Sequence, residues 1–243
     1  MKFSIVFLLA VFLFICVPQS LAKIDSLPPS YNEFDQTPPT DDKKREMLRT
    51  LKQRAKENPQ DPKIYDAMAF MSDDLGDYEK ELWALENQVK YISGYDQESK
   101  ATVYQNLARM YIINKRADEA KPWLEKSDAI DPASQFALGH WVTYYIVKDD
   151  SPAMAKKLKA FADAAPERDI YYETYLYIMD GKDMTPPEAI KFFEEAVKVD
   201  PKSAKAHRTL AAALRNLNPF NKVTERFDQV MAHLKEAIRF EPK

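Results

Sequence analysis

The sequence predicts an all-α fold in which antiparallel helix pairs follow one another along the chain. An Asp-Pro dipeptide begins at Asp61, Asp131 and Asp200, so the same turn signal returns after 70 and 69 residues, about twice 35. Further turn signals fall near the two midpoints, and a residue before proline is pushed out of helical geometry. The segments between these turns carry apolar residues at helical spacing. A helix therefore ends at each turn, and each interval of about 35 residues between turns holds two helices.

The first 22 residues have the organisation of a secretory signal peptide. Lys2 precedes an almost entirely apolar run over residues 3–17, and the segment ends in small residues at Ala22. As a helix this run spans roughly 22 Å, less than the ~30 Å hydrocarbon core of a bilayer. We expect cleavage after Ala22 and export to the periplasm or cell envelope, with secretion as the alternative destination. An uncleaved membrane anchor and lipidation at Cys16 are the other possibilities for this end.

Residues 23–43 are expected to form a proline-rich linker. Two Pro-Pro dipeptides, at Pro28 and Pro38, lie among polar residues with few aliphatic side chains to bury. A helix then begins near Lys44 and runs to Glu57. Its stripe of apolar residues is expected to cover the N-terminal end of the array, and the stripe consists of Met47, Leu48, Leu51 and Ala55.

Five units follow, predicted at about residues 62–96, 97–132, 133–166, 167–201 and 202–242. In the first helix of the second unit, one face carries residues at i, i+3, i+4 and i+7, namely Tyr104, Leu107, Ala108 and Tyr111. The fifth unit repeats this pattern with His207, Leu210, Ala211 and Leu214. In the fourth unit, Thr185 and Glu188 predict a capping box at the start of the second helix. The extra length of the fifth unit is assigned to a turn around residues 216–221.

These residues and their spacing resemble the tetratricopeptide repeat (TPR), a unit of two antiparallel helices. The second unit matches best, with large, small and proline positions occupied by Tyr104, Leu107, Ala108, Tyr111, Ala120, Leu124 and Pro132. The resemblance covers residues from about 45 to 243. It implies a right-handed superhelical array, a TPR-like α-solenoid of about five units plus the N-terminal helix, with the first helices lining a concave groove. It also implies a scaffold that binds proteins.

Composition argues against several other functions. Four glycines with no Gly-x-Gly spacing provide no phosphate-binding loop, and 35 basic and 38 acidic residues are interspersed without a basic patch for nucleic acid or lipid. The only cysteine is Cys16, so a cleaved chain has no thiolate ligand. His140, His207 and His233 show no metal-binding spacing, and His207 is expected to be a packed core residue. The sequence thus predicts no enzyme, no cofactor and no metal.

Aromatic residues are concentrated in the first helices of the third and fourth units, in numbers too large for one core stripe. Some of them are therefore expected to border a groove for a peptide or partner helix. The candidate groove residues are Gln105, Arg109, His140, Tyr144, Tyr171, Tyr175 and Arg208. The alternative is that these aromatic residues only pack between adjacent first helices.

The leading functional hypothesis is an exported scaffold that binds a protein partner, whose identity the sequence does not give, and helps to assemble a cell-envelope complex. A second hypothesis is a structural subunit that uses its outer faces. A third is an enzyme built on a repeat scaffold. Contact with the membrane is expected only through an uncleaved or lipidated N-terminal segment.

Overall fold

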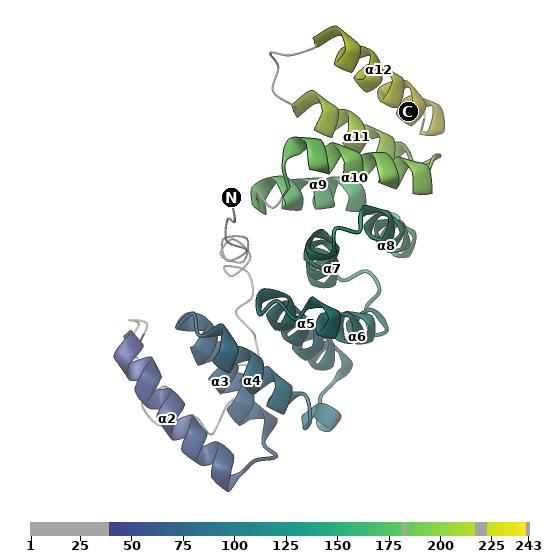
Figure 1. Ribbon diagram of the computed structural model, residues 1–243. Helices are drawn as coiled ribbons and strands as arrows, with labels where there is room; N and C mark the ends of the chain where they lie inside the picture. The colour runs from purple at the N-terminus through teal and green to yellow at the C-terminus, as the bar shows by residue number, and fades with distance from the viewer. Residues whose placement is uncertain (1–38, 182–183, 217–222, 242–243) are drawn as a thin grey trace. The chain divides into compact units, whose positions relative to one another are not determined.

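The computed structural model describes residues 39–181, 184–216 and 223–241, and all regular structure within them is helical (Figure 1). This confirms the predicted all-α class. The predicted signal peptide, most of the linker and most of the turn at 216–221 lie outside the described residues. The chain divides into two compact units, Met1–Gly94 and Tyr95–Lys243, which are described separately.

The described residues of the first compact unit, 39–94, form three α-helices. Helix α2 (Asp41–Glu57) packs against α3 (Pro62–Asp74), which pairs with α4 (Tyr78–Gln88), and a 3-10 helix, η4 (Ile92–Gly94), follows. Helix α2 begins three residues before the predicted Lys44, because the Thr40 hydroxyl accepts a hydrogen bond from the Lys43 amide and caps the helix there. Its buried residues are Met47, Leu51 and Ala55, which belong to the predicted stripe.

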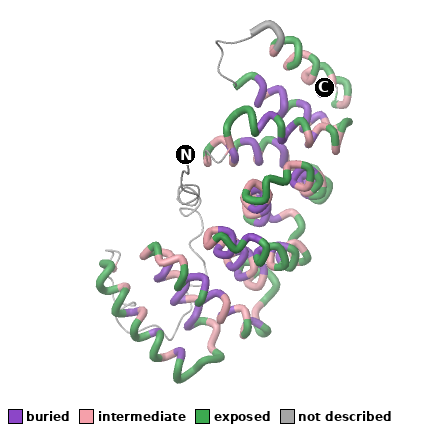
Figure 2. Tube along the Cα trace, in the orientation of Figure 1, coloured by how far each residue is buried: buried purple, intermediate pink, exposed green. Residues whose placement is uncertain are grey.

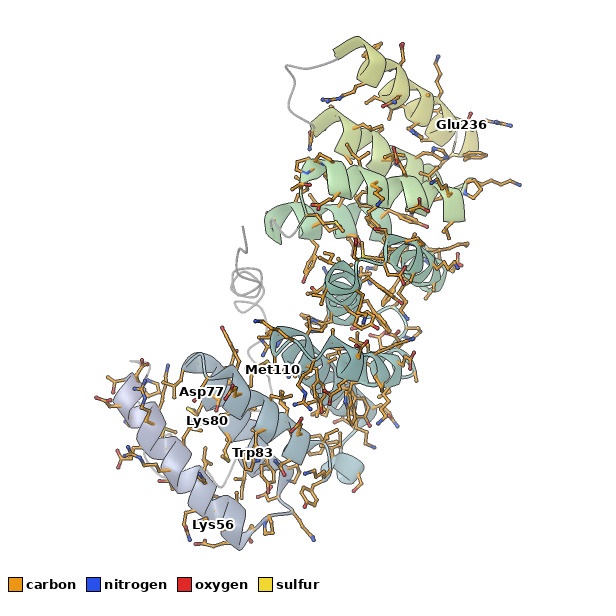
Figure 3. The ribbon with its side chains drawn as sticks, in the orientation of Figure 1. Lys56, Asp77, Lys80, Trp83, Met110 and Glu236 are labelled. Atoms are coloured by element: carbon orange, nitrogen blue, oxygen red, sulfur yellow. The ribbon has the colours of Figure 1, made fainter. Side chains whose placement is uncertain are left out.

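The turn between α3 and α4 depends on a glycine. Gly76 has a φ of +67°, a conformation that other residues adopt only at a steric cost. The next residue, Asp77, accepts a hydrogen bond from the Lys80 amide and caps α4, and its carboxylate also pairs with the Lys80 ammonium (Figure 3). These bonds hold the pKa of Asp77 below its ordinary value, the Lys80 side chain being the largest cause. The short connection makes α3 and α4 antiparallel neighbours.

The second compact unit contains four helix pairs. The pairs are α5 (Gln97–Ile113) with α6 (Ala117–Asp128), α7 (Gln135–Lys148) with α8 (Ser151–Ala164), α9 (Ile170–Gly181) with α10 (Pro186–Val199), and α11 (Ala204–Asn216) with α12 (Val223–Phe240). The first helices contact one another in chain order, α5 with α7, α7 with α9 and α9 with α11. Helix α10 packs mainly on α8 and α11. Successive pairs therefore share one continuous apolar interior, as the repeat predicts.

Both small and large residues are buried in this interior, and Figure 2 shows buried residues along its helices. Ala108, Ala120 and Ala189 are at most 1% exposed, which allows close approach of the helices that carry them. The large side chains Leu124 and Phe193 are fully buried beside them. The capping box predicted for the fourth unit is also present, since the Thr185 amide donates to Glu188 Oε2 at 2.7 Å and the Glu188 pKa is lowered, chiefly by the Thr185 hydroxyl.

Candidate functional site

The residues predicted to line a groove divide into a buried and a partly exposed group. Gln105, Tyr144, Tyr171 and Tyr175 are between 1% and 7% exposed, so their side chains lie within the protein. Arg109, His140 and Arg208 keep part of their surface accessible. The buried group makes contacts inside the protein, with second helices as well as first helices. A contact of the other three with a partner stays a prediction.

Gln105 connects helices of the second compact unit by hydrogen bonds. Its amide nitrogen donates to the hydroxyl of Ser127 at 2.8 Å and to that of Ser134 at 3.1 Å. These bonds join α5 to the end of α6 and to the residue that caps α7. Because all three groups are buried, the bonds satisfy donors and acceptors that would otherwise be costly to remove from water.

The two buried tyrosines of α9 reach into other helices. The Tyr171 hydroxyl donates to Asp200 Oδ2 at 3.2 Å, and burial, followed by the charge of Asp200, raises the pKa of Tyr171 far above its ordinary value. Tyr175 packs edge-on against Phe193, with ring centroids 5.9 Å apart, and its hydroxyl accepts from Asn216 of α11. Both side chains therefore fix α9 against α10 and α11.

His140 and Arg208 occupy different electrostatic surroundings. Burial, and secondly the positive charge of Arg109, lower the pKa of His140 to about 3, so its imidazole is neutral at pH 7 even though the side chain is partly accessible. Arg208 of α11 bonds Glu241 Oε2 at 2.6 Å and lies 3.8 Å from Asp169 Oδ2. Its guanidinium thus links α11 to the residues flanking α12 and α9.

Large apolar side chains are exposed on the first helices α7 and α9. We call the four of them the first-helix face, and they are Phe136 at 41%, Val147 at 41%, Tyr172 at 44% and Leu176 at 48% exposure. Eleven residues, or three helical turns, separate Phe136 from Val147, and four separate Tyr172 from Leu176. Each pair therefore forms a stripe along one side of its helix.

Tyr177 of α9 joins the two helices that carry the stripes. Its hydroxyl lies 2.9 Å from the Thr143 hydroxyl of α7, and its ring covers Gly139, where an added Cβ would be 3.2 Å from the ring. These contacts hold α9 against α7, so the two stripes lie on helices that are in direct contact.

Two members of this face are next in sequence to residues that were predicted to line the groove. Tyr172 and Leu176 each follow a predicted residue by one position, and one position turns a helical side chain by about 100°. Tyr171 and Tyr175 instead share their side with Thr174 and Ile178, which are 1% and 0% exposed. The buried residues cover a wide arc of α9, and only the remaining side of the helix can reach solvent. This was the signal that could have identified Tyr172 and Leu176 as the exposed residues.

A second exposed aromatic residue lies in the first compact unit. Trp83 of α4 is 45% exposed (Figure 3). Its ring meets that of Tyr65 edge-on with centroids 6.0 Å apart, and Tyr65 also stacks on Tyr91 at 6.3 Å. The Tyr65 hydroxyl donates to the Pro59 carbonyl at 2.9 Å, which holds this aromatic group in place.

Two histidines that are 26 positions apart meet between α11 and α12. The Nδ1 atoms of His207 and His233 are 3.0 Å apart, and His207 Nε2 lies 3.1 Å from the Pro201 carbonyl oxygen. Since a carbonyl only accepts, His207 carries its proton on Nε2 and accepts at Nδ1 from His233. His207 is 6% exposed, in agreement with its predicted core position. Within the described ranges, no three His, Cys, Asp or Glu side chains are grouped as metal ligands.

None of the helices in the described part of the chain combines the length and apolar character needed to cross a membrane.

Comparison with known proteins places one helix pair in a family. Residues 101–134, which include most of α5, all of α6 and the following turn, match the tetratricopeptide repeat model TPR_8. No curated protein sequence matches the chain.

Several solved structures are similar at low sequence identity. MamA is 16% identical with a TM-score of 0.42, over 74% of this chain and 91% of MamA. YrrB, described as a TPR protein with an unusual peptide-binding site, is 16% identical with a TM-score of 0.42, over 79% of this chain and 93% of YrrB. A chain of the APC/C hetero-tetramer Cut9–Hcn1 is 14% identical with a TM-score of 0.43, over 83% of this chain and 38% of that one. The α5–α6 pair is thus similar in sequence to a tetratricopeptide repeat.

Proposed function

We propose that this protein is a non-enzymatic tetratricopeptide-repeat scaffold that binds an apolar segment of a protein partner on the first-helix face. The single observation that carries the proposal is the exposure of Phe136, Val147, Tyr172 and Leu176 on two adjacent helices. Single exposed apolar residues are ordinary on a protein surface, but several gathered on one side are typical of an interaction site. The family match of residues 101–134 supports the same class of function.

The neighbouring groups define what such a partner offers. Two aromatic rings and two aliphatic side chains bind apolar side chains, and the neutral His140 on the same side of α7 adds hydrogen-bonding groups without a charge. Stripes of residues spaced by four and eleven positions suit an amphipathic helix or an extended peptide that places large side chains between α7 and α9. Nothing on this face calls for a strongly charged partner.

Export completes the proposal. The N-terminal signal peptide would place the scaffold in the periplasm or cell envelope, where it would take part in assembling an envelope complex. Determination of the N-terminal residue of the protein purified from an envelope fraction tests this step. A chain beginning at Lys23 supports export with cleavage, and an intact chain found only in the cytosol contradicts it.

The binding proposal is tested by capture of the partner from the envelope fraction. The tagged full-length chain is compared with Tyr172→Ser combined with Leu176→Ser, and Trp83→Ser serves as the control because it removes an exposed aromatic residue of similar accessibility from another helix. The partner should be captured by the unmodified chain and by the control, and lost with the double variant. Capture by the double variant at an unchanged yield would refute the assignment of this face.

The alternative of a structural subunit that uses its outer faces is favoured by Trp83. This exposed ring lies on a second helix and is supported by Tyr65 from behind. Under this alternative the same experiment gives the opposite pattern, with the partner lost in Trp83→Ser and kept in the double variant.

A further inference from the structure

The last helix of the chain has two apolar sides. One side packs on α11: Ala237 is 3% exposed, the rings of His233 and Phe240 lie 5.3 and 5.9 Å from that of His207, and α11 is the main neighbour of α12. The other side carries Phe227 and Ile238, which are 61% and 66% exposed. An amphipathic helix at the edge of a protein would normally expose polar residues there.

The exposed apolar residues of α12 form a complete stripe. Phe227, Met231, Leu234 and Ile238 stand at i, i+4, i+7 and i+11, so they lie along one line over about 16 Å of the helix. Met231 and Leu234 are partly exposed, and Figure 2 shows α12 largely in the colours of exposed and intermediate residues. We call these four residues the α12 stripe. It is the kind of seam by which two helices pack along their length.

We propose that the α12 stripe binds the α12 stripe of a second copy of this chain, with the two helices antiparallel. The stripe is symmetric about the point between Ala232 and His233. Phe227 and Ile238 are equally far from that point, and so are Met231 and Leu234. In an antiparallel pair each Phe227 would lie opposite Ile238 of the other copy, and each Met231 opposite Leu234.

Charge complementarity favours the antiparallel orientation and a second copy of this chain as the binding partner. One flank of the stripe carries Asp228, Lys235 and Arg239, all exposed. A two-fold axis through the midpoint brings the same flank of both helices together, and it sets Asp228 of each copy between Lys235 and Arg239 of the other. Under this two-fold axis, the negative charge of each helix lies opposite the two positive charges of the other helix. A parallel pair would place this flank against the opposite one, and the four attractive contacts would be lost.

The opposite flank is compatible with such a pair. It carries Arg226, Val230 and Ala237 and ends near Glu241, whose carboxylate bonds Arg208 of α11. In the antiparallel pair Arg226 of one copy lies toward the Glu241 end of the other copy, so the two Arg226 side chains do not meet on that side. The pairing surface also leaves the first-helix face of α7 and α9 uninvolved, and it is independent of the proposed function.

Charge-reversal variants of the full-length chain test the pairing without touching its interior. Asp228→Lys makes the flank wholly positive, and Lys235→Glu combined with Arg239→Glu makes it wholly negative. Sedimentation equilibrium should show a dimer for the unmodified chain, and each variant alone should dissociate with a Kd raised roughly tenfold or more. An equimolar mixture of the two variants should again form dimers, each containing one copy of each variant.

Folding is monitored by circular dichroism, and all three proteins should show the same helical spectrum because the altered groups are exposed. An additional variant that removes the apolar contacts, Phe227→Ser with Ile238→Ser, should be monomeric in every mixture. An unmodified chain that remains monomeric at high concentration overturns the proposal. So does a dimer that the separate charge variants leave unchanged, or a mixture that fails to form the heterodimer.

Discussion

Substitution of Phe193 by alanine is the most direct test of the packing between helix pairs. Phe193 lies on α10 and is fully buried. Its ring is 4.7 Å from that of Phe192 and 5.9 Å from that of Tyr175 on α9, measured between centroids. The substitution removes a whole aromatic side chain from a place that no solvent reaches, and the neighbouring rings are held by contacts of their own.

The expected loss follows from burial and from the cavity that remains. Replacing a buried phenylalanine by alanine typically costs about 3 to 5 kcal/mol, part of it because the surroundings collapse only partly. Tyr175 also accepts a hydrogen bond from Asn216, which restrains it from filling the space. We therefore expect the upper part of that range. For a unit of this size each kcal/mol corresponds to about 2 to 4 °C in Tm, so a loss of about 4 to 5 kcal/mol should lower Tm by about 8 to 20 °C.

Thermal and urea melts followed by circular dichroism measure this loss, and hydrogen exchange locates it. Because stability in a repeat array is largely local, protection should fall first in α9 and α10. Phe136→Ala is the matched control: the same chemical change at a side chain that is 41% exposed, with an expected effect below about 1 kcal/mol. Equal melting temperatures for the two variants would refute the shared apolar interior.

Three further substitutions test individual contacts. Asp128→Ala should cost about 1 to 3 kcal/mol in a urea melt, because the Trp141 indole N–H, which donates to Asp128 Oδ2 at 2.9 Å, loses its acceptor. Gly139→Val should cost about 1 to 3 kcal/mol in the same assay, since the Tyr177 ring lies 3.2 Å from an added Cβ; an unchanged midpoint would show that the ring moves freely. The pKa of His140 is lowered to about 3 in the folded chain. Below about pH 6.5, His140 therefore binds a proton in the unfolded chain but not in the folded chain. Stability is therefore unaffected above that pH and falls below it, by up to about 2 kcal/mol at pH 5, and His140→Gln should reduce this loss in melts recorded from pH 7.5 to 5.

Much of the architecture could be predicted from the sequence because turns and helix starts are local. Asp61 and Thr185 stand where a side chain caps the following helix, and each precedes a proline that suits a first helical turn. The helix ahead of the first pair was likewise visible in its apolar spacing. Its start was misplaced by three residues because Thr40, in a polar segment, provides a cap that hydrophobic periodicity does not register.

The candidate site was harder to predict, since adjacent residues of a helix differ only in direction. Tyr171 and Tyr172 have the same chemistry, but one is 1% and the other 44% exposed. The difference depends on where α10 and α11 lie, which spacing within α9 does not specify. The contact between His207 and His233 is of the same kind, because two separate helices must be packed before their side chains can be compared.

Two apolar surfaces on one chain have a joint consequence. Under the two proposals, the α12 stripe pairs with a second copy and the first-helix face binds a partner, so a dimer would present two partner sites held at a fixed separation. A partner displayed in several copies on an envelope assembly would then be held by both sites, and its apparent affinity would exceed that of one site without any new contact. The charge variants of α12 separate these effects. They should weaken binding to a densely coated surface while leaving the affinity for a single free partner unchanged, whereas substitution of Tyr172 and Leu176 should reduce both. Equal binding of monomeric and dimeric forms to the dense surface would show that the two apolar surfaces act independently.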